Sequence, residues 1–284
     1  MDIIKPKDCS LILEGGTFRT IYTAGILDSF LDHKLMMPYI IGISAGAINA
    51  CSYVSRQKER TFRVLADYRH DKRYMGFRNF IKEKSLFGLN FAYDVVPNQL
   101  DLFDWDTYQQ HDGTVLFGVT NAITGEIEYM NALEMDRQCT MLRATCAIPL
   151  LFPEIKINDT PYFDGGLADP IPIRKALEDG YDKHVIILTR PKGYRKEMDR
   201  QSKWVIRLLR KKYPKLVEQM EARVDKYNET IELCEKLEKQ GNAIIFRPEF
   251  ALNSMEKNLV NMKKGYQMGY KLGNDGLQQL KSFL

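Results

Sequence analysis

The sequence predicts an α/β fold with a mostly parallel central sheet flanked by helices, followed by a helix-rich C-terminal extension. Two observations lead to this prediction. Up to Pro191, short apolar runs alternate with helical patterns, which is typical of a parallel sheet covered by helices. Beyond Pro191 the chain is more charged and its patterns are mainly helical. We therefore expect an α/β domain at residues 1–191 and an extension at residues 192–284 that packs on or beside it.

The expected elements follow the order of these runs. Short apolar stretches predict strands at residues 10–13, 40–43, 115–119 and 185–188. Helical patterns predict helices at residues 21–31, 45–54 and 173–177. Residues 61–102 are aromatic and basic without strand alternation, so we expect helical cover with loops there. In the extension the pattern predicts helices at residues 215–239 and 254–280 and a short strand at 243–246.

The composition bounds the function. A chain of 284 residues with 44% hydrophobic content is long enough to bury a full core. The net charge of +4 is small, and no zinc, helix-turn-helix or RNA-binding signature is present, so nucleic acid is not an expected partner. The five cysteines are scattered, which predicts reduced core residues. No His, Cys and Asp cluster has metal-ligand spacing, so neither a metal nor a cofactor is expected.

The start of the chain carries no targeting pattern. Residues 1–7 include Asp2, Lys5 and Lys7 and have no apolar core, which predicts neither a secretory signal nor an anchor. No window approaches the roughly 20 apolar residues that span a bilayer. We therefore expect a cytoplasmic protein that meets a membrane, if at all, from its surface at the inner face.

The most informative motif is Gly-x-Ser-x-Gly at residues 42–46. An apolar run ends at this motif, and small residues beginning with Ala45 then open a helix. A serine at such a strand–turn–helix elbow takes strained backbone geometry, and only glycine at Gly42 and Gly46 leaves room for the helix to pass the strand. The pattern predicts that Ser44 is a nucleophile. A tight turn without chemistry is the alternative.

A second motif, Glu-Gly-Gly-Thr-Phe-Arg, begins at Glu14 after the first predicted strand. A glycine turn at this place leaves backbone N–H groups free to point at an oxygen, which is how an oxyanion hole is built. A phosphate-binding loop requires other glycine spacings, and neither the Walker nor the dinucleotide pattern is met. We therefore interpret Gly15, Gly16 and Thr17 as oxyanion donors.

A third motif places Asp164 before Gly165 and Gly166. An aspartate at such a turn often only caps the local backbone, but together with the other two motifs it is a candidate base. A Ser-acid-His triad would need a histidine after the acid, and His184 is the one histidine downstream. His184 precedes its strand and would face the wrong edge of a parallel sheet. A dyad of Ser44 and Asp164 is the better interpretation.

These three motifs, in this order, resemble the patatin-like phospholipase family. Its pattern is Gly-Gly-Gly-x-Arg/Lys-Gly, then Gly-x-Ser-x-Gly, then Asp-Gly-Gly/Ala. The resemblance extends through residues 23–27, 143–149 and 169–172 and covers roughly residues 10–191. It implies a three-layer α/β sandwich at residues 1–191 that forms the catalytic domain.

The resemblance implies that Ser44 attacks an ester carbonyl, that Asp164 accepts its proton, and that the amides of Gly15, Gly16 and Thr17 hold the oxyanion. Arg19 matches the basic position of the family pattern. Thr17 and Thr20 stand where the family has glycine. Threonine resists positive φ and its branched side chain crowds the loop, and losing one oxyanion donor costs about 10²–10³ in turnover.

The segment from Arg190 to Lys215 is strongly basic and interleaved with apolar residues. On a helix, Trp204, Val205, Leu208 and Leu209 would share one face, with basic residues mainly on the other. This pattern is typical of an interfacial helix attracted to an anionic membrane surface. The alternatives are a helix that packs its apolar face on the sheet and a surface that docks a partner.

The sequence thus predicts a metal-independent serine hydrolase, a lipid acyl hydrolase of the phospholipase A type that acts through an acyl-enzyme. The residues alone indicate a serine esterase, and the resemblance supplies the lipid substrate. One alternative is a weak or inactive family member that serves as a lipid-binding or protein-docking module. A thioesterase or acyltransferase that uses the same dyad is another.

Overall fold

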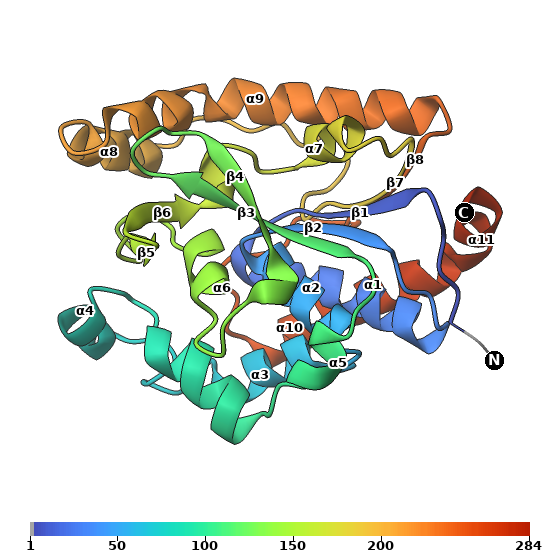
Figure 1. The fold of residues 1–284 in the computed structure, drawn as a ribbon, viewed down its shortest axis with the longest axis horizontal. Coiled ribbons are helices and arrows are strands. Elements are labelled where there is room, and N and C mark those ends of the chain that lie inside the picture. The colour runs from blue at the N-terminus through green and yellow to red at the C-terminus, as the bar shows by residue number, and fades with distance from the viewer. Residues whose placement is uncertain (1–2) are drawn as a thin grey trace.

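The computed structural model describes residues 3–284, which contain one eight-stranded mixed sheet (Figure 1). Seven of the strands follow the order β5-β6-β3-β2-β1-β7-β8. The eighth strand, β4, is not in this order and pairs with β3. The parallel part is formed by β1 (Cys9–Leu13), β2 (Tyr39–Ile43), β3 (Thr114–Asn121), β7 (Lys183–Ile187) and β8 (Ala243–Phe246). The antiparallel edge is formed by β4 (Ile127–Asn131), β5 (Ile155–Ile157) and β6 (Thr160–Asp164).

Helices cover both faces of this sheet (Figure 1). One face carries α7 (Ile173–Glu178) and the long α9 (Pro214–Lys239), with α8 (Arg200–Leu209) beside α9. The other face carries α1 (Ile21–Asp32), α2 (Ala45–Val54), α3 (Arg60–Tyr68), α5 (Trp105–Gln109), α6 (Thr140–Thr145) and α10 (Leu259–Asp275). The remaining helical segments are α4 (Phe77–Glu83), α11 (Leu277–Phe283), the π-helix η2 (Phe91–Leu100) and the short 3₁₀ turns η1 (Thr17–Thr20), η3 (Ala132–Glu134) and η4 (Gly165–Leu167).

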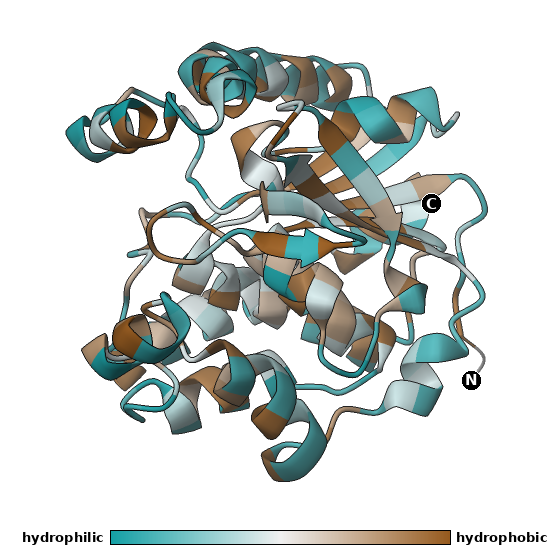
Figure 2. Ribbon diagram, turned by 60° about the vertical axis from the view of Figure 1, so that its left-hand side comes forward, coloured by the Kyte–Doolittle hydropathy of each residue, from teal (hydrophilic) through white to brown (hydrophobic). Residues whose placement is uncertain are grey.

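Alternate residues of the central strands build two separate cores. On β1, Leu11 and Leu13 pack in the cluster that contains Ile26 of α1, whereas Ile12 packs with Ile231 of α9. Successive side chains of a strand point to opposite faces, so a strand covered on both faces must be apolar throughout. This is why β1 and β2 are continuous apolar runs in the sequence. Figure 2 shows brown, hydrophobic residues on the strands at the centre of the molecule.

The predicted α/β fold is confirmed. The five predicted strands and the helices α1, α2, α7 and α9 are present, with ends shifted by a few residues at most. The three antiparallel strands were not predicted, because β5 has three residues and β4 is only half-buried, so neither gives an apolar run. The helix expected at residues 254–280 begins later, at Leu259, where the Asn258 side chain accepts the N–H of Val260 at 2.8 Å.

The C-terminal region is joined to the sheet and to α1. Strand β8 pairs in parallel with β7, so the expected boundary at residue 191 falls between two neighbouring strands of one sheet. Helix α10 lies so close to α1 that a Cβ on Gly269 would be 2.0 Å from the carbonyl oxygen of Tyr22. Within residues 3–284, no helix is long and apolar enough to cross a membrane.

Candidate active site

Ser44 occupies a tight turn between β2 and α2. Its φ of 54° and ψ of −126° lie in a region that L residues rarely adopt. A Cβ on Gly42 would lie 2.6 Å from the Ala47 Cα atom. A Cβ on Gly46 would lie 2.4 Å from the Leu13 carbonyl oxygen. Both glycines are therefore required by close backbone approach, and the strand–turn–helix expected at this motif is present.

Thr145, which lies on α6, holds the Ser44 turn in place. Its hydroxyl oxygen accepts the N–H of Ser44 at 2.9 Å, and the hydroxyl donates to the Gly118 carbonyl of β3 at 2.6 Å. The Ser44 amide is therefore engaged inside the protein and cannot bind a substrate oxygen. Thr145 lies in the segment 143–149 that resembles the family, but no pattern in the sequence assigns it this contact.

The structure brings Asp164, at the end of β6, next to Ser44. Asp164 is only 6% exposed and accepts the N–H of Gly166 at 2.8 Å, and it lies close enough to the Ser44 hydroxyl for that group to lower its pKa. Burial raises the pKa of Asp164, against the opposing effects of the Ser44 and Gly166 hydrogen bonds and of the Arg223 charge. The serine hydroxyl therefore faces a carboxylate that is more basic than an exposed aspartate.

The two glycines after Asp164 let this turn pack tightly. A Cβ on Gly165 would lie 2.1 Å from the carbonyl oxygen of Gly118, so no side chain fits there. The Gly166 carbonyl accepts Arg223 Nε at 2.5 Å, which connects the Asp164 turn to α9. Sequence reasoning missed Arg223, because nothing in the charged pattern of α9 distinguishes it from its exposed neighbours.

The glycine loop approaches the same place after β1. A Cβ on Gly15 would lie 3.0 Å from the Ser44 Cβ, so this loop is in direct contact with the serine. Within residues 3–284, the N–H groups of Gly15, Gly16 and Thr17 have no protein acceptor. The structure therefore brings together the serine, the aspartate and the three amides that the sequence singled out.

Thr17 adopts the conformation for which the family pattern uses glycine. Its φ is 50°, and its hydroxyl group contacts two carbonyl oxygens, at 2.7 Å in Gly16 and 2.6 Å in Ser254. Hydrogen bonds of this kind offset the strain of the left-handed region. Thr20 has an ordinary φ of −70°, and its hydroxyl donates to the Thr17 carbonyl at 2.8 Å. Both threonines are thus accommodated without displacing the loop amides.

Glu14, the first residue of the glycine loop, anchors this loop to the rest of the protein. The buried carboxylate accepts the Thr189 N–H at 2.6 Å and the Tyr227 hydroxyl at 3.0 Å. Thr189 follows β7 and Tyr227 lies on α9, so the loop is held by two distant parts of the chain. The Arg19 guanidinium lies 3.1 Å from the position of a Cβ on Gly16, and its buried Nε has no partner within residues 3–284.

An apolar cavity of about 130 Å³ opens beside Ser44. Its lining is mainly aliphatic and aromatic and includes Phe18, Ile48, Tyr93, Leu142 and Phe152, and Thr17 and Ser44 lie at its wall. A cavity of this composition suits a hydrocarbon chain. Sequence reasoning did not find it, because its lining comes from segments spread between residues 17 and 255.

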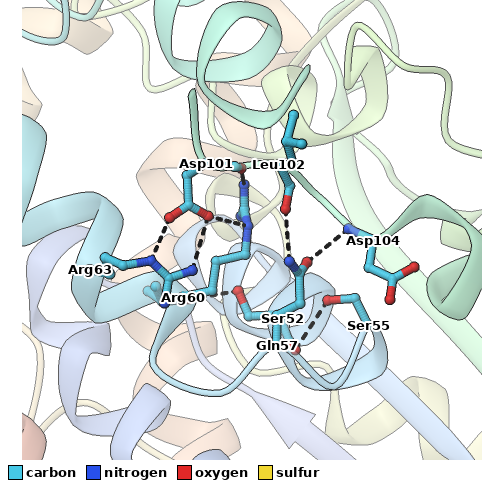
Figure 3. A network of polar contacts seen from close by, with 9 residues as sticks. Ser52, Ser55, Gln57, Arg60, Arg63, Asp101, Leu102 and Asp104 are labelled. Carbon is cyan, nitrogen blue, oxygen red and sulfur yellow. Dashed lines mark hydrogen bonds and ion pairs between the residues drawn. The ribbon is translucent and has the colours of Figure 1, made fainter. Parts of the chain in front are cut away.

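One wall of the cavity is held by the polar network in Figure 3. The Asp101 carboxylate pairs with Arg60 at 3.1 Å and with Arg63 at 2.5 Å. Gln57 bridges the Leu102 carbonyl at 2.8 Å and the Asp104 N–H at 3.0 Å. The network ties the loop after η2 to the start of α3, so this wall is fixed.

The histidines lie away from this site. His184 is buried at the amino end of β7, where its Nδ1 contacts the Ser10 hydroxyl at 2.8 Å, and burial lowers its pKa to about 4. His33 contacts Asn274 and His70 is exposed. Among residues 3–284, no group of three or more His, Cys, Asp or Glu side chains is arranged to hold a metal ion.

A mostly parallel sheet that presents a serine on a strand–turn–helix elbow is an architecture of serine hydrolases. Comparison with known protein families identifies the family of serine hydrolases to which this chain belongs. The profile of the patatin-like phospholipase family matches residues 11–177, and the chain belongs to this family of serine hydrolases. A domain of unknown function, DUF6363, matches residues 213–284.

Two curated proteins are similar in sequence. The uncharacterized protein YjjU of Escherichia coli strain K12 is 26% identical over 201 residues, which cover 66% of this chain and 53% of that protein. The chain therefore spans about half the length of YjjU. The probable lipid hydrolase 463L of Invertebrate iridescent virus 6 is 27% identical over 223 residues, which cover 72% of this chain and 70% of that protein.

One solved structure has the same fold. The crystal structure of VipD from Legionella pneumophila superposes with a TM-score of 0.52 at 14% sequence identity. The match covers 98% of this chain and 67% of VipD. At this identity the likeness concerns the fold alone.

Proposed function

We propose that this protein is a lipid acyl hydrolase of the phospholipase A type that cleaves carboxylic ester bonds of phospholipids or related lipids. One observation carries the proposal. The Ser44 hydroxyl faces the buried Asp164 carboxylate beside three free loop amides, at the wall of an apolar cavity. Residues 1–191 supply these reacting groups, and residues 192–284 contribute Arg223 and Tyr227, which hold the two turns.

In the first step, Ser44 Oγ attacks the ester carbonyl while Asp164 takes the hydroxyl proton. The negative charge that develops on the carbonyl oxygen is bound by the amides of Gly15, Gly16 and Thr17. The tetrahedral intermediate then collapses. The C–O bond to the alcohol breaks, the alcohol leaves with the proton held by Asp164, and the acyl group remains on Ser44.

In the second step, water replaces the alcohol. Asp164 takes a proton from the water, whose oxygen attacks the acyl-enzyme carbonyl, and the same amides bind the new oxyanion. Collapse breaks the bond to Ser44, which recovers its proton from Asp164 as the fatty acid leaves. Burial assists both steps because it brings the pKa of Asp164 closer to neutral pH than that of an exposed aspartate.

The alternative of an inactive binding module rests on Thr17 and Thr20. The backbone argues against it, because Thr17 holds a positive φ and leaves its N–H without a protein acceptor. The Thr17 hydroxyl donates to the Ser254 carbonyl, so the side chain does not occupy the Thr17 N–H. We therefore favour an active enzyme.

Labelling with a fluorophosphonate tests the proposal directly. We expect the reagent to modify Ser44 in a 1:1 ratio, because phosphonylation requires an activated nucleophile and an oxyanion site. Mass spectrometry of the digested protein locates the adduct. The Ser44→Ala variant should remain unlabelled, whereas exposed Ser282→Ala should label like the wild type. A folded wild type that does not react would favour the binding module.

We also propose that a surface formed by α4 and α8 contacts anionic membranes; we call it the lipid-facing surface. Both helices lie on the same side of the molecule, on the left in Figure 1. The structure divides the apolar face expected on α8, because Val205 is buried while Trp204 and Leu208 are 58% and 50% exposed. Phe77, Phe80 and Ile81 of α4 are also exposed.

Two features argue for lipid as the partner of this surface. Exposed basic residues interleave with the apolar ones, at Arg78, Lys82 and Lys84 around α4 and at Lys203 and Arg207 on α8. Tyr74 and Phe87, which flank α4, both line the cavity, so this surface adjoins the cavity that would hold an acyl chain.

Replacing Phe77 and Trp204 together by alanine should weaken binding to vesicles that contain phosphatidylglycerol by about tenfold or more, because each ring contributes about 1–3 kcal/mol on burial. Cosedimentation measures this change. Ile4→Ala removes an exposed apolar side chain at a residue that pairs with Leu35 after α1, away from α4 and α8 in Figure 1, and should leave vesicle binding unchanged. Equal binding of all three proteins would contradict the lipid-facing surface.

A further inference from the structure

Four cationic side chains gather at the edge of the sheet that carries Ser44. Arg19 follows β1, Arg190 and Lys196 lie in the loop after β7, and Arg223 lies on α9. Strands β1, β2 and β7 are parallel, so their carboxyl ends share one edge, and Ser44 follows β2 at this edge. We call these four residues the cation cluster.

One member of the cation cluster, Arg223, lies at the Asp164 turn. Arg223 Nε donates to the Gly166 carbonyl at 2.5 Å, and the N–H of Gly166 donates to Asp164. The guanidinium of Arg223 lies close enough to Asp164 for its charge to lower the pKa of that carboxyl. Arg223 therefore lies beside the reacting groups and is only partly buried.

The other members surround the anchor of the glycine loop. Lys196 Nζ lies 5.7 Å from the centre of the Tyr227 ring, whose hydroxyl donates to Glu14. The Arg190 guanidinium lies 4.5 Å from the centre of the Tyr194 ring, which packs edge-on against Tyr227. These contacts place Lys196 and Arg190 around the residues that hold the glycine loop, and this loop contacts Ser44.

The loop that carries Lys196 is fixed on α9. The Asn228 side chain accepts the Lys196 N–H at 2.8 Å and donates to the Lys196 carbonyl at 3.1 Å. This two-way contact holds the backbone of an otherwise irregular segment. The position of Lys196 is therefore built into the fold, unlike that of a surface lysine on a mobile chain.

The four cations of the cluster outnumber the carboxylates whose charges act on them, which are Glu14, Asp164 and Asp199. Burial and then the charges of Arg223, Arg19 and Arg190 lower the pKa of Lys196 to about 8, and Glu14 opposes them. Burial and then Arg190 also lower the pKa of Arg19, whose Nε lacks a partner within residues 3–284. Like charges held together in partly buried positions are typical of a site that binds an anion.

We propose that Arg19, Arg190, Lys196 and Arg223 bind the phosphate group of a lipid whose acyl chain occupies the apolar cavity. The inference rests on the proposed function and narrows it, because it selects phosphate-bearing lipids over neutral glycerides. The ester carbonyl then lies between two anchors, the phosphate on the cation cluster and the chain in the cavity. Binding energy at both ends orients the scissile bond toward Ser44.

Two substrates that differ only in the phosphate test the inference. We compare kcat/KM for 1-octanoyl-lysophosphatidate and 1-octanoylglycerol, both below their critical micelle concentrations so that membrane binding plays no part. Lys196→Met should lower the ratio of the first value to the second by about tenfold, since a charge-assisted hydrogen bond is lost. Lys263→Met, at an exposed lysine of α10, removes the same charge and should leave the ratio unchanged. An unchanged ratio in Lys196→Met would overturn the proposal.

Calorimetry provides a readout that does not depend on turnover. Glycerol 3-phosphate should bind the wild type, and Lys196→Met should weaken that binding by about tenfold. Binding of inorganic phosphate without glycerol 3-phosphate would identify a site for the free ion and overturn the lipid assignment. If neither octanoyl ester is hydrolysed by the wild type but glycerol 3-phosphate binds in this way, the proposed hydrolase function fails and the phosphate site stands.

Discussion

Ser44→Ala should lower the hydrolysis of p-nitrophenyl esters by about 10⁴- to 10⁶-fold, because loss of the nucleophile removes the acyl-enzyme route and leaves only binding and oxyanion stabilisation. In the wild type, kcat/KM should rise about threefold to fourfold for each methylene added to the acyl chain until the cavity of about 130 Å³ is filled. Release of p-nitrophenol, followed with esters of two to twelve carbons, measures both effects.

The control for this prediction is Ser282→Ala, which removes an exposed hydroxyl on α11. Its rates should equal those of the wild type. Circular dichroism should show that Ser44→Ala folds, since alanine removes only the hydroxyl and leaves the turn between Gly42 and Gly46 intact. Retention of a tenth or more of the activity by Ser44→Ala would exclude Ser44 as the nucleophile. A rate that does not depend on chain length would mean that the cavity does not bind the acyl chain.

The sequence specifies the parallel part of the fold because both faces of those strands are covered. Residues such as Leu11 and Ile12 point into different cores, and both positions must be apolar, which makes a run that stands out from its surroundings. Strands β4 and β5 are short and half-exposed, so their residues follow no such rule. The close approach of α10 to α1 likewise depends on Gly269 and Tyr22, which lie far apart in the chain.

The proposed reacting groups could be singled out from the sequence because each lies in a local motif with a strict backbone requirement. The elbow needs Gly42 and Gly46, and the Asp164 turn needs Gly165. The groups that position them could not be predicted. Thr145, Glu14 and Arg223 reach the site through contacts between elements distant in sequence, and their residue types are common elsewhere in the chain.

Thr17 shows how a residue can depart from a motif and keep its geometry. From the sequence, a branched residue at a position that resembles a family glycine casts doubt on the oxyanion loop. In the structure its hydroxyl reaches the Gly16 and Ser254 carbonyls and supports the positive φ. The compensating partner, Ser254, comes from the loop before α10, more than two hundred residues further along the chain.

Asp164→Asn should lower kcat by about 10⁴-fold while leaving the fold intact. Asparagine has nearly the same shape, and its carbonyl oxygen can still accept the Gly166 N–H, but it cannot take the proton from Ser44. Ester hydrolysis measures the loss. Asp275→Asn, an exposed aspartate of α10, is the matched control and should retain full activity. If Asp164→Asn kept activity within tenfold of the wild type, a group other than Asp164 would have to accept the proton of the Ser44 hydroxyl.

The pH dependence of the wild type follows from the same carboxyl group. In the proposed mechanism catalysis requires the ionised form of Asp164, and burial raises its pKa above the ordinary aspartate value of 3.8. kcat/KM should therefore fall as the pH decreases, with a midpoint above 3.8 that reports the folded pKa. Since Arg223 lowers this pKa, Arg223→Met should move the midpoint to higher pH.

The same residue should oppose stability at neutral pH. The folded pKa of Asp164 lies above the unfolded one, so the folded state holds its proton more tightly, and this contribution to stability is lost as the pH rises through the folded pKa. Asp164→Asn has no charge to bury, and its free energy of unfolding in urea at pH 7.5 should exceed that of the wild type by about 0.5–2 kcal/mol. The gain should shrink as the pH falls through the folded pKa and below 3.8, since aspartate is then mostly protonated in both states. A variant that is inactive and more stable at pH 7.5 would mean that burial, which makes Asp164 basic enough to serve Ser44, also costs the protein folding free energy.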